Sequence, residues 1–391
     1  MTVSSENGYD LVAAPWRRPQ HETRGDQVGS NGDKVIRFPH GRAGSGDSER
    51  EGADLTAGAL KSGWLTQGTA AVELQRAAET YLERHVVPVA GGSAALHLAL
   101  LAVNVGDGGE VILPAVSSSS TANLIILAGG RPIFADIEAP DRPFLEAADA
   151  NRLVGPRTRA VLTVHEAGYP AFTDDLRRVA DDRTVTLLED CRTALGATVD
   201  GRPVGAAGRL AIFAVGDSPA AGGLVATPSE NVERHLTTLR STVIATDDKC
   251  FSHDCASGMA NGYRIDEAAA SAGVRALAEI PAAVTRRHDL AMAAGERLSA
   301  AGLRVLGAAA DDDRASPSWR WLIVLTPSRE RRDEIVSACR RAGIEALMPV
   351  AAFAQPAQLH RRALPNTRAF CDLALKLAVV PGLDRRLAEI L

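Results

Sequence analysis

The chain has 391 residues, of which 46% are hydrophobic and 23% are charged, a composition typical of a globular protein with two or three domains. Its net charge of −5 argues against a nucleic-acid-binding protein, because such proteins usually carry a basic surface. No apolar run reaches the roughly 18 residues of a transmembrane helix. Five scattered cysteines and an N-terminus without a signal-peptide pattern predict a cytoplasmic protein with reduced thiols. Only four residues are lysines: Lys34, Lys61, Lys249 and Lys376.

Residues 1–52 are expected to form a disordered leader, because they are rich in Gly, Ser and charged residues and have no sustained apolar period. Apolar residues at helical spacing then predict a helix within 70–85. Strands are expected at 86–91, 110–115, 131–137, 159–168, 184–191, 209–215 and 222–228, and further helices at 93–104, 120–130, 150–154 and 174–182. This alternation predicts a large α/β domain over residues 53–267 with a mainly parallel, doubly covered sheet.

The last third of the chain, residues 268–391, has a different pattern. A long Ala-rich helical region is followed by the strand-like segment 319–327, a helix at 329–343, the short segment 344–350 and a closing helix. We therefore expect a long connecting helix and a smaller C-terminal α+β domain.

Several segments occur in a characteristic order. They are SGWLTQG (62–68), GGSAALHLAL (91–100), GDGGEVILPAVSSSSTAN (106–123), GGRPIFADI (129–137), RTRAVLTVHEAGYPA (157–171), LLEDCRTALGA (187–197) and GYRIDEAAA (262–270). This order and spacing resemble the DegT/DnrJ/EryC1/StrS family of sugar aminotransferases. The resemblance implies the fold-type-I architecture of enzymes that use pyridoxal phosphate (PLP), a dimer, and a role in bacterial antibiotic or deoxysugar pathways.

Two positions suit a ligand for physical reasons. Gly92, Ser93 and Ala94 stand where a strand passes into a helix N-terminus, which favours a phosphate, although a Gly-Gly-Ser sequence also serves as a plain N-cap. Asp190 ends an apolar strand at the sheet edge where α/β enzymes bind ligands, although a carboxylate there can simply cap a turn. The resemblance implies that the first group binds the cofactor phosphate and that Asp190 pairs with the pyridinium nitrogen.

The resemblance also assigns three further residues. His165 matches a histidine that the family commonly has beside the cofactor ring, while Tyr263 and Arg264 precede the long helix and support the site or the dimer. Cys191, directly after Asp190, is either a nucleophile or a packed small residue. The pattern Cys250-x-x-His253-x-Cys255 has metal-like spacing but only three ligands, so we expect no metal.

The chain departs from the family at the cofactor. PLP enzymes bind the cofactor as a Schiff base with a lysine, yet the corresponding segment 212–228 contains no lysine and is shorter by about four residues. The resemblance implies that Ser118 stands where the family has an aromatic residue that stacks on the cofactor ring, and that Thr193 stands where it has a glutamine. Gly262, with Asn261 beside it, stands where the family has an asparagine that binds the cofactor phosphate. We expect Lys376 in the small domain, so Lys249 is the one lysine expected to approach the site, from another loop. These departures predict that no cofactor is bound.

Three functions remain open. The first is an enzyme that performs PLP-independent acid/base or group-transfer chemistry on a small polar or phosphorylated metabolite. Its catalytic residues would be His165, Asp190 and Asp217, with substrate or anion contacts from Gly92, Ser93, Ala94, Ser118, Thr193, Ser218, Asn261, Tyr263 and Arg264. The second is a non-catalytic partner subunit of an active paralogue. The third is a dehydratase or transaminase that binds pyridoxamine phosphate (PMP) or PLP non-covalently. We expect a homodimer in the first case and a heterodimer in the second.

Overall fold

The computed structural model describes residues 63, 65–216, 222–241, 245–247, 250–252, 262–306, 314–349 and 362–391. The expected leader at 1–52 lies outside these residues. Several residues singled out from the sequence also lie outside them: Asp217, Ser218, Lys249, His253, Cys255 and Asn261.

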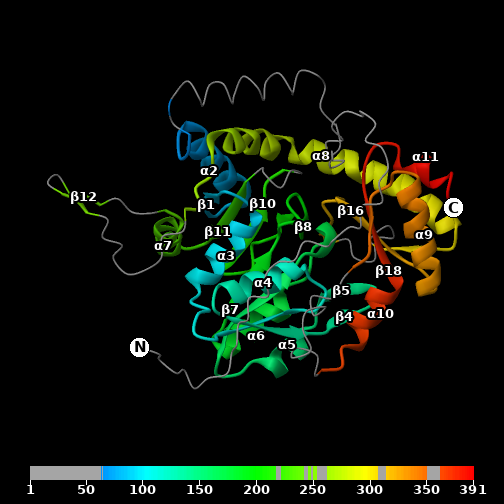
Figure 1. Cartoon of the computed structure of the whole chain (residues 1–391), viewed down its shortest axis with the longest axis horizontal. Coiled ribbons are helices and arrows are strands. Elements are labelled where there is room, and N and C mark those ends of the chain that lie inside the picture. Colours follow the sequence, from blue (N-terminus) through cyan, green and yellow to red (C-terminus); the bar gives the residue numbers. More distant parts are fainter. Residues whose placement is uncertain are drawn as a thin grey trace, which may run out of the picture. The chain divides into compact units, whose positions relative to one another are not determined.

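A seven-stranded mixed sheet forms the centre of the large domain (Figure 1). Its strands are β1 (His85–Val89), β2 (Glu110–Pro114), β3 (Arg131–Ala135), β6 (Thr158–Val164), β7 (Thr186–Asp190), β10 (Leu210–Ala214) and β11 (Gly223–Thr227), in the order β1-β11-β10-β7-β6-β2-β3. The pairs from β10 to β3 are parallel, whereas β11 is antiparallel to both β10 and β1. The predicted mainly parallel sheet is therefore confirmed, and β2, β6 and β7 end at one edge.

Helices cover both faces of this sheet, because successive side chains of a strand point to opposite faces and both sets are apolar. Val87, Leu113 and Leu162 pack with the residues of α3 (Gly92–Ala102), α4 (Ser119–Leu127) and α7 (Glu230–Arg240). Val86 and Val161 face the other side, which is covered by α2 (Thr69–Leu82), α5 (Ala147–Leu153), α6 (Asp174–Arg183) and part of α8 (Glu267–Ala300). The sheet is thus doubly covered, as the sequence predicts.

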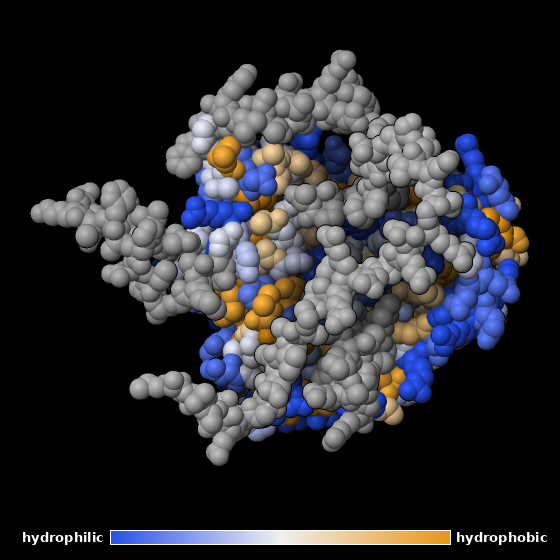
Figure 2. Space-filling view, viewed as in Figure 1, coloured by the Kyte–Doolittle hydropathy of each residue, from blue (hydrophilic) through white to orange (hydrophobic). Residues whose placement is uncertain are grey.

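Helix α8 connects this core to the small domain (Figure 1). Its residue Leu277 is buried in the large-domain core, while Leu298 is buried in the small-domain core. The small domain is an antiparallel sheet of β14 (Arg304–Val305), β16 (Trp321–Leu325), β18 (Ala374–Ala378) and β17 (Ala346–Leu347), with α9 (Arg329–Arg341), α10 (Pro365–Leu373) and α11 (Leu383–Leu387). Figure 2 shows hydrophilic residues gathered over α9 at the right-hand edge, as expected for a solvated RERRDE segment.

The remaining described elements are short. They are β4 (Ile137–Ala139), β5 (Arg142–Leu145), β8 (Thr198–Val199), β9 (Arg202–Pro203), β12 (Ala245–Asp247), β13 (Cys250–Ser252), β15 (Ala315–Ser316) and the 3-10 helix η1 (Glu166–Gly168). Among the described residues, no helix combines the length and the apolar character needed to cross a membrane.

One buried carboxylate at the start of α8 caps a second helix. The oxygens of Glu267 accept hydrogen bonds from the backbone N–H groups of Gly68 (2.7 Å), Ala70 (2.8 Å) and Ala71 (3.2 Å) at the N-terminus of α2. No side chain at the N-cap position of α2 satisfies these donors. Glu267 therefore joins the N-termini of α2 and α8, two of the helices that cover this side of the sheet.

We expect Glu267→Ala to lower the free energy of unfolding by about 1–3 kcal/mol, because it leaves buried N–H donors of α2 without a partner. Urea unfolding measures the change. Glu73→Ala is the matched control, since Glu73 is exposed on the same helix, and its effect should stay within about 0.5 kcal/mol. Equal losses of stability in the two variants would contradict a capping role for Glu267.

Candidate active site

A cavity of about 460 Å³ lies where the ends of β2, β6 and β7 meet the small domain. The large domain contributes Val116, Ser117, Ser118, Ser119, Val164, Glu166, Ala167, Asp190, Arg192 and Thr193, and the small domain contributes Trp321, Leu347, Met348, Pro349 and Lys376. A volume of this size holds a small metabolite or a cofactor. Three of the residues predicted from the sequence, Ser118, Asp190 and Thr193, are thus brought together.

Asp190 is buried in the cavity wall and holds a planar cation. Nε of Arg192 donates to Oδ1 of Asp190 at 2.8 Å, and a terminal nitrogen of the same guanidinium donates to Oδ2 at 2.6 Å. Burial lowers the pKa of Arg192, but the charge and hydrogen bonds of Asp190 outweigh it and hold that pKa above its usual value. This two-point geometry is the strongest form of an Arg–carboxylate pair.

The side chain of Arg192 also lies against the first turn of α3. A Cβ atom placed on Gly92 would stand 3.1 Å from Cδ of Arg192, so a larger residue here would require Arg192 to move by a few tenths of an ångström. Gly91 at the N-cap position provides no side chain to cap the helix, and Ser93 and Ala94 follow Gly92 in the first turn. The N-terminus of this helix, where the helix dipole is positive, therefore lies next to the Arg192 side chain. Gly92, Ser93 and Ala94 do not themselves line the cavity.

The serines between β2 and α4 have different roles. The hydroxyl of Ser118 caps α4 by accepting from the backbone N–H of Ser120 at 3.3 Å. The hydroxyl of Ser117 is buried and has no hydrogen-bond partner within the part of the chain that the structure describes. Such an unsatisfied polar atom is costly, and Ser117 is among the residues that line the cavity. Across the cavity, the hydroxyl of Thr193 donates to the carbonyl of His165 at 3.1 Å.

The small domain brings an amine and an aromatic ring to this cavity. Lys376 on β18 pairs with Ile323 of β16 on one side and with Leu347 of β17 on the other. Trp321 lies two residues from Ile323 on the same face of the sheet, and this face looks toward the large domain. The ammonium of Lys376 lies 2.8 Å from Oε1 of Glu166 in η1. The sequence-based view that Lys376 is out of reach of the site is therefore wrong.

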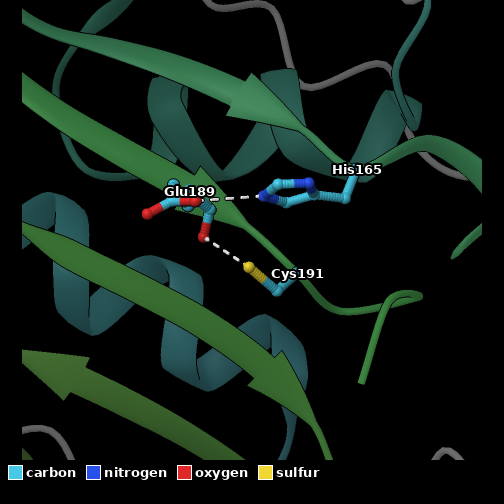
Figure 3. Close-up of side chains that lie close together, drawn as sticks. All are labelled: His165, Glu189 and Cys191. Carbon is cyan, nitrogen blue, oxygen red and sulfur yellow. Dashed lines mark hydrogen bonds and ion pairs between the residues drawn. The ribbon is translucent and has the colours of Figure 1, made fainter. Parts of the chain in front are cut away.

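His165 does not line the cavity; its ring lies in the buried cluster shown in Figure 3. Its Nδ1 accepts from the backbone N–H of Ala171 at 3.0 Å, so the proton lies on Nε2, which is 3.2 Å from Oε2 of Glu189. The Cys191 thiol lies beside them, 3.8 Å from the backbone carbonyl of Glu189, and burial raises its pKa well above the ordinary value. A thiol in this state is a packed side chain rather than a nucleophile.

This cluster has the composition of a metal site, since one ligand atom from each of His165, Glu189 and Cys191 lies within 4.8 Å of the others. The ligand atoms of Glu189 are already engaged, however. The backbone N–H groups of Gly205 (3.1 Å) and Gly208 donate to its two oxygens in addition to the His165 contact. The geometry is that of a satisfied hydrogen-bond network that ties the segment 205–208 to β7.

The segment before α8 contributes less directly. The hydroxyl of Tyr263 is 2.7 Å from Nδ1 of His97 on α3, and its backbone bonds to Ala90 and Arg240. Neither Tyr263 nor Arg264 lines the cavity. Tyr263 therefore stabilises the position of α3 through its contact with His97.

Residues 47–389 match the profile of the DegT/DnrJ/EryC1/StrS aminotransferase family. The chain belongs to this family. Among the similar solved structures is DesV of S. venezuelae in complex with a ketimine intermediate, with 29% identity and a TM-score of 0.74 over 88% of this chain and 92% of that chain. The aminotransferase TlmJ from Streptoalloteichus hindustanus has 24% identity and a TM-score of 0.78 over 87% of this chain and 93% of that chain. The PLP form of the putative sugar aminotransferase Spr1654 from Streptococcus pneumoniae has 20% identity and a TM-score of 0.76 over 88% of this chain and 97% of that chain. The fold-type-I aminotransferase architecture predicted from the sequence is thereby confirmed.

The expectation that no cofactor is bound is wrong for a member of the DegT/DnrJ/EryC1/StrS family. Spr1654 has been solved in a PLP form and in a PMP form, and the DesV structure holds a ketimine intermediate. The absence of a lysine from residues 212–228 does not outweigh these findings, because a cofactor can also be bound without a covalent bond, and Lys376 lines the cavity.

The site residues that sequence reasoning missed include Ser117, Glu166, Arg192, Trp321 and Lys376. Arg192 carried a signal, since it follows Asp190 by two residues and a long cation next to a strand-end carboxylate is suited to pair with it. No feature of the sequence marked Trp321 and Lys376, because their approach to the cavity depends on how the small domain packs against η1.

Glu189 gives the buried cluster a pH dependence. Burial raises its pKa, but the hydrogen bond from His165, the N–H of Gly208 and the charge of Arg84 outweigh burial and hold the pKa below its usual range. A carboxyl with a lowered pKa in the folded state stabilises the fold above its unfolded pKa of about 4.3, and this contribution is lost as the pH falls through the folded-state value.

We expect Glu189→Gln to lower the free energy of unfolding at neutral pH by about 3 kcal/mol, because it breaks a buried hydrogen-bonded pair. Its unfolding free energy should also fall less steeply than that of the wild type below about pH 5. Urea unfolding over a pH series measures both effects, with Asp181→Asn, on the exposed face of α6, as the control. Parallel pH profiles for wild type and Glu189→Gln would refute the assignment.

Proposed function

We propose that the cavity beside Asp190 is the active site of an enzyme that binds PLP or PMP and acts on a small polar metabolite of the sugar type. The observation that carries this proposal is the convergence of Asp190, the orphaned hydroxyl of Ser117 and the amine of Lys376 in one cavity. Membership of an aminotransferase family supplies the reaction class, and the putative sugar aminotransferase among the similar structures supports the substrate class.

The side chains of this cavity suit the cofactor at several points. The Asp190 carboxylate already binds a planar cation through two N–H donors, and a protonated pyridine ring presents the same charge and an N–H donor. Ser117 offers an unsatisfied hydroxyl, and Trp321 offers an aromatic face. The first turn of α3 has free N–H groups that suit a phosphate, although this turn does not line the cavity. One feature opposes binding, because Arg192 occupies both Asp190 oxygens and must release them.

When bound, PLP supplies an electron sink at the carbon that gains or loses the amino group. The protein's own groups perform the other tasks. Asp190 holds a proton on the ring nitrogen, which strengthens that sink. Glu166 and Lys376 form an acid/base pair inside the cavity, and Leu347 and Met348 add apolar surface that restricts water.

Binding of PMP to the purified protein, measured by equilibrium dialysis, tests this proposal. PMP is the better probe because it carries an amine in place of the aldehyde and cannot react with lysines. We expect saturable binding and, with an amino donor and a keto sugar, amino transfer. The proposal fails if PMP does not bind. Binding that arises only after mixing with an active family member would instead support the partner-subunit alternative.

A further inference from the structure

We propose that Lys376 is the amine that bonds covalently to the carbonyl carbon of PLP in this cavity, in place of a lysine in segment 212–228. This inference rests on the proposed function and names the residue that would make the covalent contact. The family resemblance does not assign this role to Lys376, because Lys376 lies on β18 of the small domain and the family's lysine is expected in the loop between β10 and β11.

The position of Lys376 is the first argument. It lines the same cavity as Asp190 and Ser117, and its side chain is 21% exposed, enough to remain accessible from the cavity. Its neighbours across the sheet, Ile323 and Leu347, are apolar and hold the strand in register. The amine is therefore fixed at one place in the wall by a strand rather than carried by a loop.

The positions of the lysines in the sequence also favour Lys376. The sequence has no lysine between Lys61 and Lys249, so no residue of the central sheet or of its connections can supply an amine. Lys376 is the only lysine among the described residues, and the structure places it in the cavity. A solvated surface is the common location of a lysine, which makes this position in a nearly lysine-free chain informative.

The contact with Glu166 supplies the acid/base chemistry that the bond needs. Glu166 is 10% exposed and lies 2.8 Å from the ammonium, so it can accept one proton and leave a neutral amine. The nitrogen lone pair then attacks the aldehyde carbon and a C–N bond forms. The carbonyl oxygen departs as water with the two protons of the amine, and a C=N bond remains. The step needs no oxidant or reductant.

A purely structural role is the competing explanation, since the same ion pair joins η1 to β18. The two roles predict different behaviour of Lys376→Arg. Arginine preserves the charge and can still pair with Glu166, but it cannot form the C=N bond. A structural role therefore predicts that Lys376→Arg resembles the wild type, whereas a covalent role predicts that it loses the adduct.

The test is incubation of the full-length protein with PLP, reduction with borohydride, and mass spectrometry of the proteolytic fragments. We expect one reduced pyridoxyl phosphate group per chain, on the fragment that contains Lys376. Lys376→Arg should lose this adduct, Lys249→Arg is the matched control and should keep it, and Glu166→Gln should form it roughly 100-fold more slowly.

An adduct on another lysine, or an adduct of unchanged yield in Lys376→Arg, would overturn the inference. PMP binding, measured in parallel, keeps the two proposals apart. If PMP binds to wild type and to Lys376→Arg but borohydride traps nothing on Lys376, the proposed function stands and the covalent role of Lys376 fails. If neither PMP nor PLP binds, both fail.

Discussion

Arg192→Met will bind PMP and PLP about 10- to 100-fold more tightly than the wild-type protein. Arg192 engages both oxygens of Asp190 and therefore competes with a pyridinium for the same carboxylate. Removing one partner of a buried ion pair costs about 3–5 kcal/mol, and a ligand that pairs with Asp190 again recovers part of that cost, at about 1.4 kcal/mol per tenfold in affinity. Methionine keeps the contact volume beside Gly92.

Equilibrium dialysis with PMP measures this gain, and thermal unfolding provides a second readout. The variant should be less stable than wild type without ligand and should gain more stability from the ligand. Arg178→Met is the matched control, because Arg178 pairs with Asp175 on the exposed surface. An affinity for PMP that is unchanged or weaker in Arg192→Met would show that Arg192 does not compete with the cofactor.

Asp190→Asn will lower PMP affinity at least about tenfold and will lower amino transfer further. The amide has the shape of the carboxylate but not its charge, so it cannot hold a proton on the ring nitrogen, and removing one member of a buried charge pair costs about 2–5 kcal/mol. The variant also leaves the Arg192 guanidinium without its partner, which should reduce stability.

The double variant Asp190→Asn, Arg192→Met separates these two effects. It removes both charges, so it should be more stable than Asp190→Asn alone, yet its PMP affinity should stay low. Asp181→Asn on the surface of α6 serves as the control for the substitution itself. Recovery of PMP affinity in the double variant would contradict the role of Asp190 as the ring-nitrogen partner.

The large domain could be predicted well from the sequence because its signals are local. Short apolar strands alternate with amphipathic helices, and each strand of the central sheet was expected within a few residues of its observed position. The antiparallel β1–β11–β10 end was harder to predict, because it brings Gly223 so close to Gly91 that a Cβ on Gly223 would lie 2.4 Å from the Gly91 backbone. That contact joins residues far apart in the sequence.

The site could be predicted only where it follows strand ends. Asp190, Thr193 and Ser118 were expected and do line the cavity. His165 was expected beside them, but its ring turns toward Glu189, because the N–H of Ala171 and the Glu189 carboxylate satisfy both ring nitrogens. Lys376 was expected in the C-terminal part of the chain, but sequence spacing does not reveal that its strand, β18, faces the cavity.

Cofactor binding in this cavity requires the Asp190 carboxylate to release the Arg192 guanidinium and to pair with the pyridinium of the cofactor. A crystal structure of the wild-type protein grown with PMP tests it most directly. We expect electron density for the pyridine ring with its nitrogen on Asp190, the hydroxyl of Ser117 bonded to the ligand, and Arg192 turned away. Arg192 still bound to both Asp190 oxygens, with no PMP in the cavity at saturating concentration, would contradict it.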